Sequence, residues 1–298
     1  MQIFMTGATG YVGGHVLQHL LKKGHTVRCV VRNRSALKIN VPQVEVVQAD
    51  VTHPESLTGL MKNCDAVIHL IAIIQEKLRK GITFEKVNYQ ATAHLVNEAK
   101  RQCVRRFLHM SALGADPDGA TPYFRTKGRA EQMVRDSGLD YTIFRPSFIF
   151  GPGDAVYAML ASILEKSPFG IMPVFGSGQY RHQPVSIHNV AQGFVAALGS
   201  PASIAKIFNV GGPQALSYNE QLDVIARVIG KRIVKIYQPL PLIRPLVALA
   251  GRLPFSPIDS DRLKMLIQDN VCDPDPFASE LGIELIPFED GLREYLAP

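Results

Sequence analysis

The sequence predicts an α/β fold, a doubly wound parallel sheet of the Rossmann type with a smaller C-terminal lobe. In the first 150 residues, short β-rich runs alternate with segments of helical periodicity, which is the pattern of βαβ units. A glycine-rich loop follows the first of these runs and opens the first helical segment. After Pro146, closely spaced prolines and glycines break the chain into short pieces, which indicates a second lobe.

The elements of the first part follow in order. Apolar and β-branched runs predict strands near residues 2–5, 26–31, 44–47, 66–70, 106–110 and 140–145. Apolar residues at i, i+3 and i+4 predict helices at 11–23, 54–63, 84–102 and 122–137. The segment 185–198 resembles a strand and a helix that return to the main sheet. We therefore assign 1–150 and about 184–212 to the Rossmann domain, and 151–183 and 213–298 to a smaller lobe for a substrate or partner.

Composition and charge narrow the class of protein. The 298 residues are 46% hydrophobic and 19% charged, which is typical of a folded globular chain with room for two domains. The net charge is +6, but no run of five basic residues occurs and aromatic residues do not alternate with basic ones, so we expect no nucleic acid partner. The apolar runs are shorter than the roughly 18–20 residues that cross a bilayer. Because a strand and a glycine loop begin directly after Met1, we expect no targeting peptide and a cytoplasmic protein.

The glycine loop carries the first functional prediction. Gly7, Gly10 and Gly13 are spaced i, i+3 and i+6 between the first strand and the first helix. A tight turn needs positive φ, a pyrophosphate must approach the backbone, and the helix must lie close to the sheet; each requirement favours glycine. The helix N-terminus then attracts the phosphates. We expect dinucleotide contacts from the loop residues Gly7, Thr9, Gly10, Tyr11, Val12 and Gly13, although a glycine turn that only packs tightly is the alternative.

The end of the second strand bears on the choice of cofactor. A carboxylate there would bind a ribose 2′-hydroxyl, whereas a cation would bind a 2′-phosphate. No acid is present, and Arg32 and Arg34 stand in its place, so the sequence favours NADP(H) over NAD(H). The alternative is that both arginines are solvated loop charges. Asp50 and Val51 follow the third strand and are placed to contact the adenine.

Three further residues predict proton chemistry. Ser111 ends the fifth strand, Tyr123 begins the next helix, and Lys127 follows one turn later on the same face. A tyrosine normally titrates near pH ~10, so it needs a nearby cation to act as a base at neutral pH. We expect Tyr123 to exchange a proton with a substrate oxygen, Ser111 to orient that oxygen, and Lys127 to supply the charge and bind the nicotinamide ribose. A tyrosine four residues before a lysine also occurs by chance in many helices.

Together these motifs resemble the short-chain dehydrogenase/reductase superfamily. The resemblance rests on TGATGYVG, VIHLIA, VNYQAT, MSA, YFRTKGRAE and RPSFIFGPGD, and it continues through PVSIHNVAQG, FNVGGP and FEDGLREYL. The loop spacing and the C-terminal lobe are similar to the extended and atypical branches, in particular to the group that includes the dehydrogenase-like accessory subunit of respiratory complex I. The resemblance implies a Ser111, Tyr123 and Lys127 active site. It also implies cofactor contacts at Gly7, Gly10, Gly13, Arg32, Asp50, Ile71, Ala72, Asn88, Pro146, Ser147 and Phe148.

The sequence departs from the sugar-nucleotide enzymes of the extended branch at two places. His188 and Asn189 stand where an aspartate is usual before Val-Ala, and Phe124 replaces the glycine that usually follows the tyrosine. Arg181 partly restores the likeness, because an arginine there often contacts a substrate diphosphate. It could equally be a surface salt-bridge partner.

Two other patterns bear on binding. His15 and His19 share a helix face, but no glutamate lies between them and no third ligand is evident, so we expect no metal. An apolar stripe at 240–253, flanked by Arg244 and Arg252, predicts either a core helix or an amphipathic segment. The second interpretation would place a peripheral membrane or respiratory-complex contact there and admit a lipid-like or quinone-like substrate.

The sequence therefore predicts an NADP(H)-binding oxidoreductase that moves hydride to or from a carbonyl or hydroxyl carbon of an unidentified small molecule. A sugar-nucleotide epimerase or dehydratase is the alternative enzyme. A non-catalytic NADPH-binding accessory subunit or redox sensor is the alternative from another class.

Overall fold

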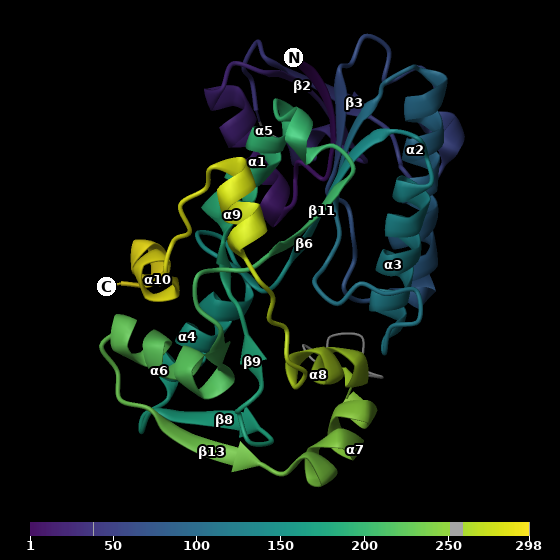
Figure 1. Ribbon diagram of the computed structural model, residues 1–298. Coiled ribbons are helices and arrows are strands. Elements are labelled where there is room, and N and C mark those ends of the chain that lie inside the picture. The colour runs from purple at the N-terminus through teal and green to yellow at the C-terminus, as the bar shows by residue number, and fades with distance from the viewer. Residues whose placement is uncertain (38, 251–258, 298) are drawn as a thin grey trace. The chain divides into compact units, whose positions relative to one another are not determined.

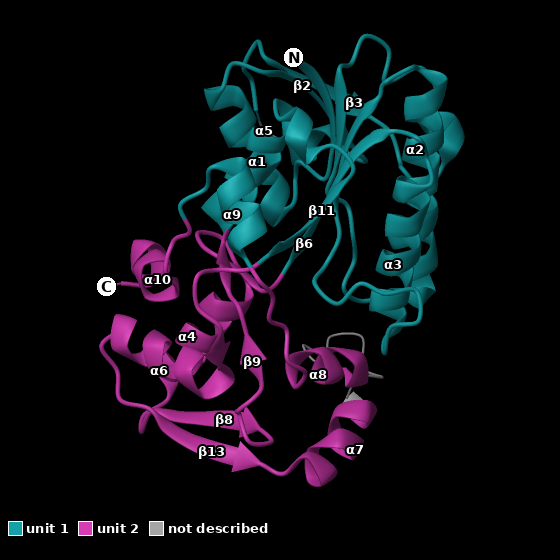
Figure 2. Ribbon diagram, in the orientation of Figure 1, with its two compact units in different colours: residues 1–146, 187–210, 274–284 teal, residues 147–186, 211–273, 285–298 magenta. Residues whose placement is uncertain are grey.

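The computed structural model describes residues 1–37, 39–250 and 259–297, and the chain forms two compact units (Figure 2). Unit 1 comprises Met1–Pro146, Ile187–Val210 and Pro274–Glu284. Unit 2 comprises Ser147–Ser186, Gly211–Asp273 and Leu285–Pro298. These bounds differ from the expected ones, since 147–150 belongs to unit 2 and 274–284 to unit 1. The second difference has a packing cause, because Phe277 is fully buried against the rings of Phe144 and Phe208 in unit 1.

Unit 1 is built on a seven-stranded parallel sheet in the order β11-β6-β5-β4-β1-β2-β3. Its strands are β1 Gln2–Thr6, β2 Thr26–Val31, β3 Val44–Gln48, β4 Ala66–His69, β5 Arg106–Met110, β6 Asp140–Pro146 and β11 Lys206–Val210. The chain runs outward from β1 in one direction through β2 and β3, and in the other through β4, β5 and β6. This reversal confirms the doubly wound sheet and puts the binding crevice at the carboxyl ends of β1 and β4.

Helices cover both faces of this sheet (Figure 1). α1 (Tyr11–Lys22) and α5 (Ile187–Leu198) pack together on one face, and α2 (Ala91–Arg101) and α3 (Pro122–Arg135) on the other. Because both faces are covered, the central strands are apolar almost throughout, and β4 is buried along its whole length. α9 (Asp275–Leu281) contacts α5 and β11.

Two helix predictions were wrong in detail. The segment 54–63 forms only a 3₁₀ turn, η2 (Pro54–Leu57), because the chain leaves the helical conformation at Thr58, with ψ 119°, and Gly59 then adopts a positive φ of 76°. The segment 84–102 begins as a π-helix, η4 (Glu85–Gln90), before it continues as α2. A π-turn within a helix often marks a functional site.

The segment at 185–198 also differs from its prediction. The strand β10 (Val185–Ser186) pairs with β7 (Ile149–Phe150) in unit 2, so it does not join the main sheet. The seventh strand of the main sheet is β11, which pairs with β6. Only the helix α5 returns to unit 1 as expected.

Unit 2 combines short strands and helices around its own core. Besides β7 and β10, its strands are β8 Ile171–Phe175, β9 Arg181–His182, β12 Leu216–Ser217 and β13 Val234–Gln238. Its helices are α4 Val156–Lys166, α6 Tyr218–Val228, α7 Leu240–Ala250, α8 Ser260–Leu266 and α10 Phe288–Leu296. Phe150, Tyr157, Leu222, Ile225 and Phe288 lie in the centre of this core.

The apolar stripe on α7 is mostly outside that core. Leu242, Leu246 and Leu249 are 67%, 61% and 64% exposed, and Val247 is buried. The core-helix interpretation is therefore wrong for these three leucines. The part of the stripe at 251–253 lies outside the described residues. Within the described ranges, no helix is long and apolar enough to cross a membrane.

Candidate cofactor and active site

The glycine loop joins β1 to α1 and requires glycine at specific atoms. Gly7 has a φ of 83°, and a Cβ on it would lie 3.2 Å from Leu70. A Cβ on Gly13 would lie 1.9 Å from the Gly7 carbonyl oxygen, so the helix can approach the loop only without a side chain. A Cβ on the neighbouring Gly14 would meet nothing within 4 Å. Glycine is therefore required at the loop positions 7 and 13 and not at the neighbouring position 14.

The N-terminus of α1 is suited to an anion. Gly10 is its N-cap and supplies no side-chain cap, and the first turn contains no acidic residue. Nothing negative in that turn therefore opposes a phosphate attracted by the helix dipole and N-terminal amides. With the backbone cradle formed by the glycines, this end of the sheet fits a dinucleotide pyrophosphate.

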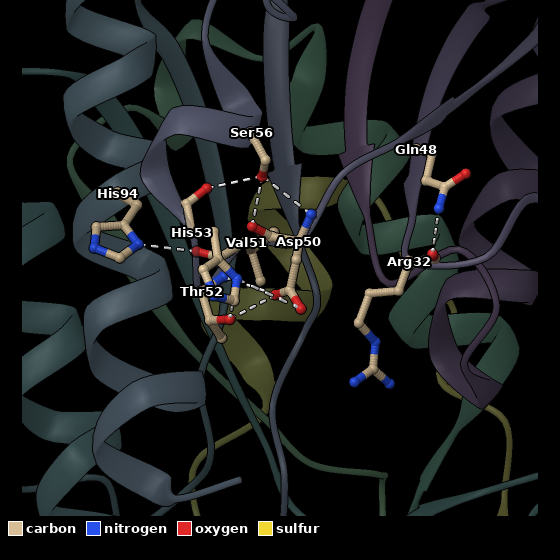
Figure 3. Close-up of polar contacts among 8 residues, drawn as sticks. All are labelled: Arg32, Gln48, Asp50, Val51, Thr52, His53, Ser56 and His94. Atoms are coloured by element: carbon tan, nitrogen blue, oxygen red, sulfur yellow. Dashed lines mark hydrogen bonds and ion pairs between the residues drawn. The ribbon is translucent and has the colours of Figure 1, made fainter. Parts of the chain in front are cut away.

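Asp50 and Val51 lie on an ordered turn beside the carboxyl end of β3 (Figure 3). One Asp50 carboxylate oxygen accepts from the Thr52 backbone N–H at 2.9 Å and from its hydroxyl at 2.7 Å. Ser56 Oγ bridges the Asp50 N–H and carbonyl at 3.1 and 2.8 Å, and His94 Nδ1 donates to the Val51 carbonyl at 2.9 Å. Partial burial opposes ionisation of Asp50, but the Thr52 hydrogen bonds, with His53 and Arg32 nearby, lower its pKa. The turn therefore presents an ionised acceptor.

Arg32 directly follows β2, Arg34 begins the 3₁₀ turn η1 (Arg34–Ala36), and both side chains are exposed. The Arg32 carbonyl accepts from Gln48 Nε2 at 3.1 Å, while its guanidinium extends away from this bond (Figure 3). Among the described residues, neither guanidinium forms an ion pair. Two cations are therefore available at the position where the ribose 2′-substituent of a dinucleotide would lie.

Ser111, Tyr123 and Lys127 come from β5 and α3. Thr121 caps α3 by accepting from the Phe124 N–H at 3.3 Å, and Pro122 sits in the first turn, so Tyr123 is held at the helix start. Lys127 Nζ donates to the Met110 carbonyl at 2.5 Å. That bond ties α3 to the residue before Ser111.

Burial controls the protonation of these groups. Ser111 is 3% exposed, and its hydroxyl has no hydrogen-bond partner in the described part of the chain. Burial raises the pKa of Tyr123 to about 12. Burial also lowers the pKa of Lys127 to about 8, partly opposed by the charge of Glu131. Burial therefore favours the neutral phenol of Tyr123.

The other predicted contacts fall in both units. Asn88 is fully buried and its carboxamide holds the Ile73 backbone, accepting from the N–H at 2.9 Å and donating to the carbonyl at 3.2 Å. Ile71 and Ala72 lie two and three residues after the end of β4, and the Ile71 nitrogen would lie 3.3 Å from a Gly7 Cβ. Pro146 ends β6 and accepts from the Leu113 N–H at 2.9 Å.

Ser147, Phe148 and Arg181 belong to unit 2. Ser147 Oγ donates to Asn270 Oδ1 at 2.7 Å, and the Phe148 ring centroid lies 4.3 Å from that of His182. Arg181 donates from Nη2 to the Ala215 carbonyl at 2.8 Å. The guanidinium of Arg181 thus bonds to a backbone carbonyl, whereas the sequence suggested a salt bridge as the alternative to a substrate contact.

A row of buried polar side chains lies on the strands next to the candidate site, and no sequence motif predicted it. His69 and His109 are fully buried, paired in register on β4 and β5, with ring centroids 5.3 Å apart. His69 bridges Thr6 Oγ1 at 2.8 Å and Thr92 Oγ1 at 3.1 Å. Neither ring nitrogen of His109 has a partner among the described residues. Each of the two predicted strands contains a histidine near its carboxyl end. Only the strand register shows that the two histidines are neighbours.

A third histidine, His188, lies close to His15 and His19, and the sequence did not indicate this. The ring of His188 on α5 lies 5.6 Å from that of His15 and 6.1 Å from that of His19. In the described ranges, however, no group of three histidine, cysteine or acidic residues has a metal-binding arrangement.

The sheet, the loop and the turn at Asp50 together define a nucleotide-binding Rossmann protein. Residues 7–201 match the NAD(P)H-binding family, and the chain belongs to that family, within the extended short-chain dehydrogenase/reductase superfamily. The resemblance seen in the motifs is thereby confirmed, as is a nicotinamide cofactor in general terms.

Three individual proteins illustrate the range of relatives. The mitochondrial 40 kDa subunit of NADH-ubiquinone oxidoreductase from Neurospora crassa is 28% identical over 297 residues, which cover 97% of this chain and 77% of that protein. A ceramide reductase from Caulobacter vibrioides is 31% identical over 200 residues, covering 67% of this chain and 61% of that protein. The structure of UDP-glucuronic acid 4-epimerase from Bacillus cereus has a TM-score of 0.78 at 21% identity, covering 99% of this chain and 98% of that one. The last likeness shows the fold alone.

Proposed function

We propose that this protein is an NADP(H)-dependent oxidoreductase that reduces a carbonyl, or oxidises the corresponding alcohol, on a lipid-like or quinone-like substrate. The observation that carries the proposal is the buried, unpartnered Ser111 hydroxyl next to the Met110 carbonyl that Lys127 holds. An unsatisfied buried hydroxyl is costly, so it favours a polar ligand at that point. It lies at the carboxyl edge of the parallel sheet, where ligands bind in this fold.

Each residue then has a defined role. Gly7, Gly10 and Gly13 hold the pyrophosphate, Asp50 binds the adenine, and Lys127 binds the nicotinamide ribose. When bound, the nicotinamide ring supplies or accepts the hydride. Ser111 donates a hydrogen bond to the substrate oxygen, and Tyr123 passes its proton to that oxygen. A hydride on carbon and a proton on oxygen together convert the carbonyl to the alcohol. Because burial keeps the Tyr123 phenol neutral, Tyr123 is in the protonation state that a general acid needs for carbonyl reduction.

The active-site roles are tested with Tyr123→Phe. The phenylalanine keeps the ring that packs 6.0 Å from Phe84, so the fold and cofactor affinity should be retained. Loss of a general acid should lower kcat by about 100-fold or more. Full turnover by the variant would refute the role of Tyr123.

The preference for NADP(H) is tested by binding. Arg32→Ala and Arg34→Ala should each weaken NADPH binding by roughly tenfold or more, since each loses a charge-assisted contact to the 2′-phosphate, and should leave NADH binding unchanged. Lys23→Ala is the matched control, because it removes an exposed cation at the other end of α1. Equal affinities of the wild type for NADH and NADPH would contradict the preference.

The proposed substrate is an apolar carbonyl compound. Support for a lipid-like substrate comes from the relative named ceramide reductase and from the exposed leucines of α7. Long-chain ketones, quinones and sugar nucleotides should therefore be compared in one NADPH-oxidation assay. We expect turnover of the apolar carbonyls only.

Two other functions have specific support. A sugar-nucleotide epimerase or dehydratase shares the fold, but Asn189 and Phe124 depart from that pattern and the Arg181 guanidinium is bonded to a carbonyl within unit 2. A non-catalytic accessory subunit is supported by the relative from respiratory complex I. In that case the exposed leucines of α7 would contact a membrane or partner subunit, and the protein would be peripheral to a membrane. Tightly retained NADPH that no substrate oxidises would favour the subunit.

A further inference from the structure

A short hairpin follows β4 and precedes the π-helix. Lys77 and Ile82 form an antiparallel bridge, with hydrogen bonds from Lys77 N–H to the Ile82 carbonyl at 2.9 Å and from Ile82 N–H to the Lys77 carbonyl at 3.3 Å. The 3₁₀ turn η3 (Leu78–Lys80) forms the tip, and Gly81, with a φ of 65°, closes it. We call residues 74–82 the basic hairpin. Its backbone bonds make it a defined element rather than an open loop.

The side chains of the basic hairpin are unusual for a surface turn. Ile74 is 59% exposed and Leu78, at the tip, is 71% exposed. Lys77, Arg79 and Lys80 flank them, all exposed and with no ion pair to any described residue. The acid of the hairpin, Glu76, is turned inward and accepts from the Phe84 N–H at 2.8 Å. The tip therefore presents the exposed Leu78 side chain beside three cations that form no ion pair with a described residue, and Ile74 is exposed on the segment that leads to the tip.

We propose that the basic hairpin docks on an anionic lipid bilayer, with Leu78 and Ile74 in the interfacial region and the three cations on the headgroups. Aliphatic side chains surrounded by Lys and Arg are the composition of interfacial membrane contacts. A protein partner is a poorer fit, because a stable interface buries about 800 Å² on each side and a nine-residue hairpin offers far less. A bilayer can bind a small hairpin tip without burying such a large area.

The root of the hairpin lies in the cofactor site of unit 1. Both backbone groups of Ile73 are held by the Asn88 carboxamide, and Ile71 passes beside Gly7. Docking of the tip would therefore place this edge of the site at the lipid surface. The idea that a lipid substrate enters there rests on the proposed function, whereas the membrane contact does not.

The contact is tested by co-sedimentation of the full chain with phosphatidylcholine vesicles, with and without phosphatidylglycerol. The wild type should bind only the anionic vesicles, and binding should weaken as salt rises. Each cation near an anionic surface contributes about fivefold, so Lys77→Gln, Arg79→Gln and Lys80→Gln together should weaken binding roughly 100-fold. Leu78→Ser should weaken it by up to roughly tenfold at any salt concentration.

Matched controls separate this surface from others. Lys22→Gln with Lys23→Gln removes exposed cations from another part of unit 1, and Leu246→Ser removes an exposed leucine from α7; both should bind as the wild type does. NADPH affinity and melting temperature of every variant should be unchanged, which distinguishes failure of docking from failure of the cofactor site. No binding of the wild type to anionic vesicles, or equal binding by the triple variant, would overturn the proposal. The proposal would also be overturned if Leu246→Ser lost vesicle binding while the variants of the basic hairpin kept it.

Discussion

Replacing His69 with glutamine should make this protein less sensitive to mild acid. His69 is fully buried between Thr6 and Thr92, and burial, together with the charge of Lys127, lowers its pKa to about 3. The folded state therefore excludes a proton that the unfolded chain accepts at a pKa of about 6.5. A histidine whose pKa is depressed by folding contributes stability above pH ~6.5, and this is lost as the pH falls toward the folded pKa.

The magnitude follows from the difference between the two pKa values. From pH ~6.5 to pH ~5 is 1.5 pH units, and each unit changes the free energy of unfolding by about 1.4 kcal/mol, so His69 alone removes about 2 kcal/mol. Burial, followed by the charges of Lys127 and His69, also holds the pKa of His109 well below its usual value, so His109 acts in the same direction. Carboxylates titrate mainly below this range, which leaves the interval from pH ~7 to pH ~5 to histidines.

The assay is urea unfolding followed by circular dichroism between pH ~7 and pH ~5. His69→Gln should lose about 2 kcal/mol less than the wild type over this interval, whatever its stability at neutral pH. His109→Leu should reduce the loss further. A His69→Gln variant with the full wild-type loss would refute the argument that His69 stays neutral in the folded state.

Three other outcomes are expected from single substitutions. Gly13→Ala should abolish dinucleotide binding, because its Cβ would lie 1.9 Å from the Gly7 carbonyl oxygen. Gly14→Ala should bind the dinucleotide normally and raise the free energy of unfolding by about 0.5–1 kcal/mol. Binding and unfolding calorimetry of both variants test this. Ser217→Ala should cost about 1 kcal/mol in thermal unfolding, because it removes the capping box of α6, and an unchanged melting temperature would contradict that role. Glu131→Gln should lower the free energy of unfolding by on the order of 2 kcal/mol, because the Glu131 side chain is 3% exposed and neutralises Arg145. A double variant with Glu131→Gln and Arg145→Met should recover part of this loss.

The strands were predictable because their signal is local. The six strands expected before residue 150 match β1 to β6 within one residue at each end, since buried parallel strands are short apolar runs bounded by polar residues. Helix signals were less complete. Apolar periodicity at 54–63 was overridden by Gly59, and the π-turn at 85–90 has no distinct periodicity.

For the candidate site, the sequence identified residue types and their order along the chain. The requirement for glycine at 7 and 13 was evident from spacing, and the structure adds the atoms that a side chain would meet. The hydrogen bond from Lys127 to Met110 was not predictable, because it joins a helix to a strand seventeen positions earlier and depends on how α3 packs. The burial that raises the pKa of Tyr123 was not predictable for a similar reason, because it depends on how α3 packs.

By itself, the sequence determined the Rossmann class, the glycine cradle, the cations after β2 and the order of Ser111, Tyr123 and Lys127, because each depends on neighbours within a few positions or on one strand-to-helix turn. Tertiary structure alone decided that β10 pairs in unit 2, that 274–284 packs in unit 1, and that His69 and His109 stand side by side. It also decided that the cations at 77–80 surround an exposed leucine on a bridged hairpin. These features arise from strand register and from contacts between distant segments, which local periodicity does not specify.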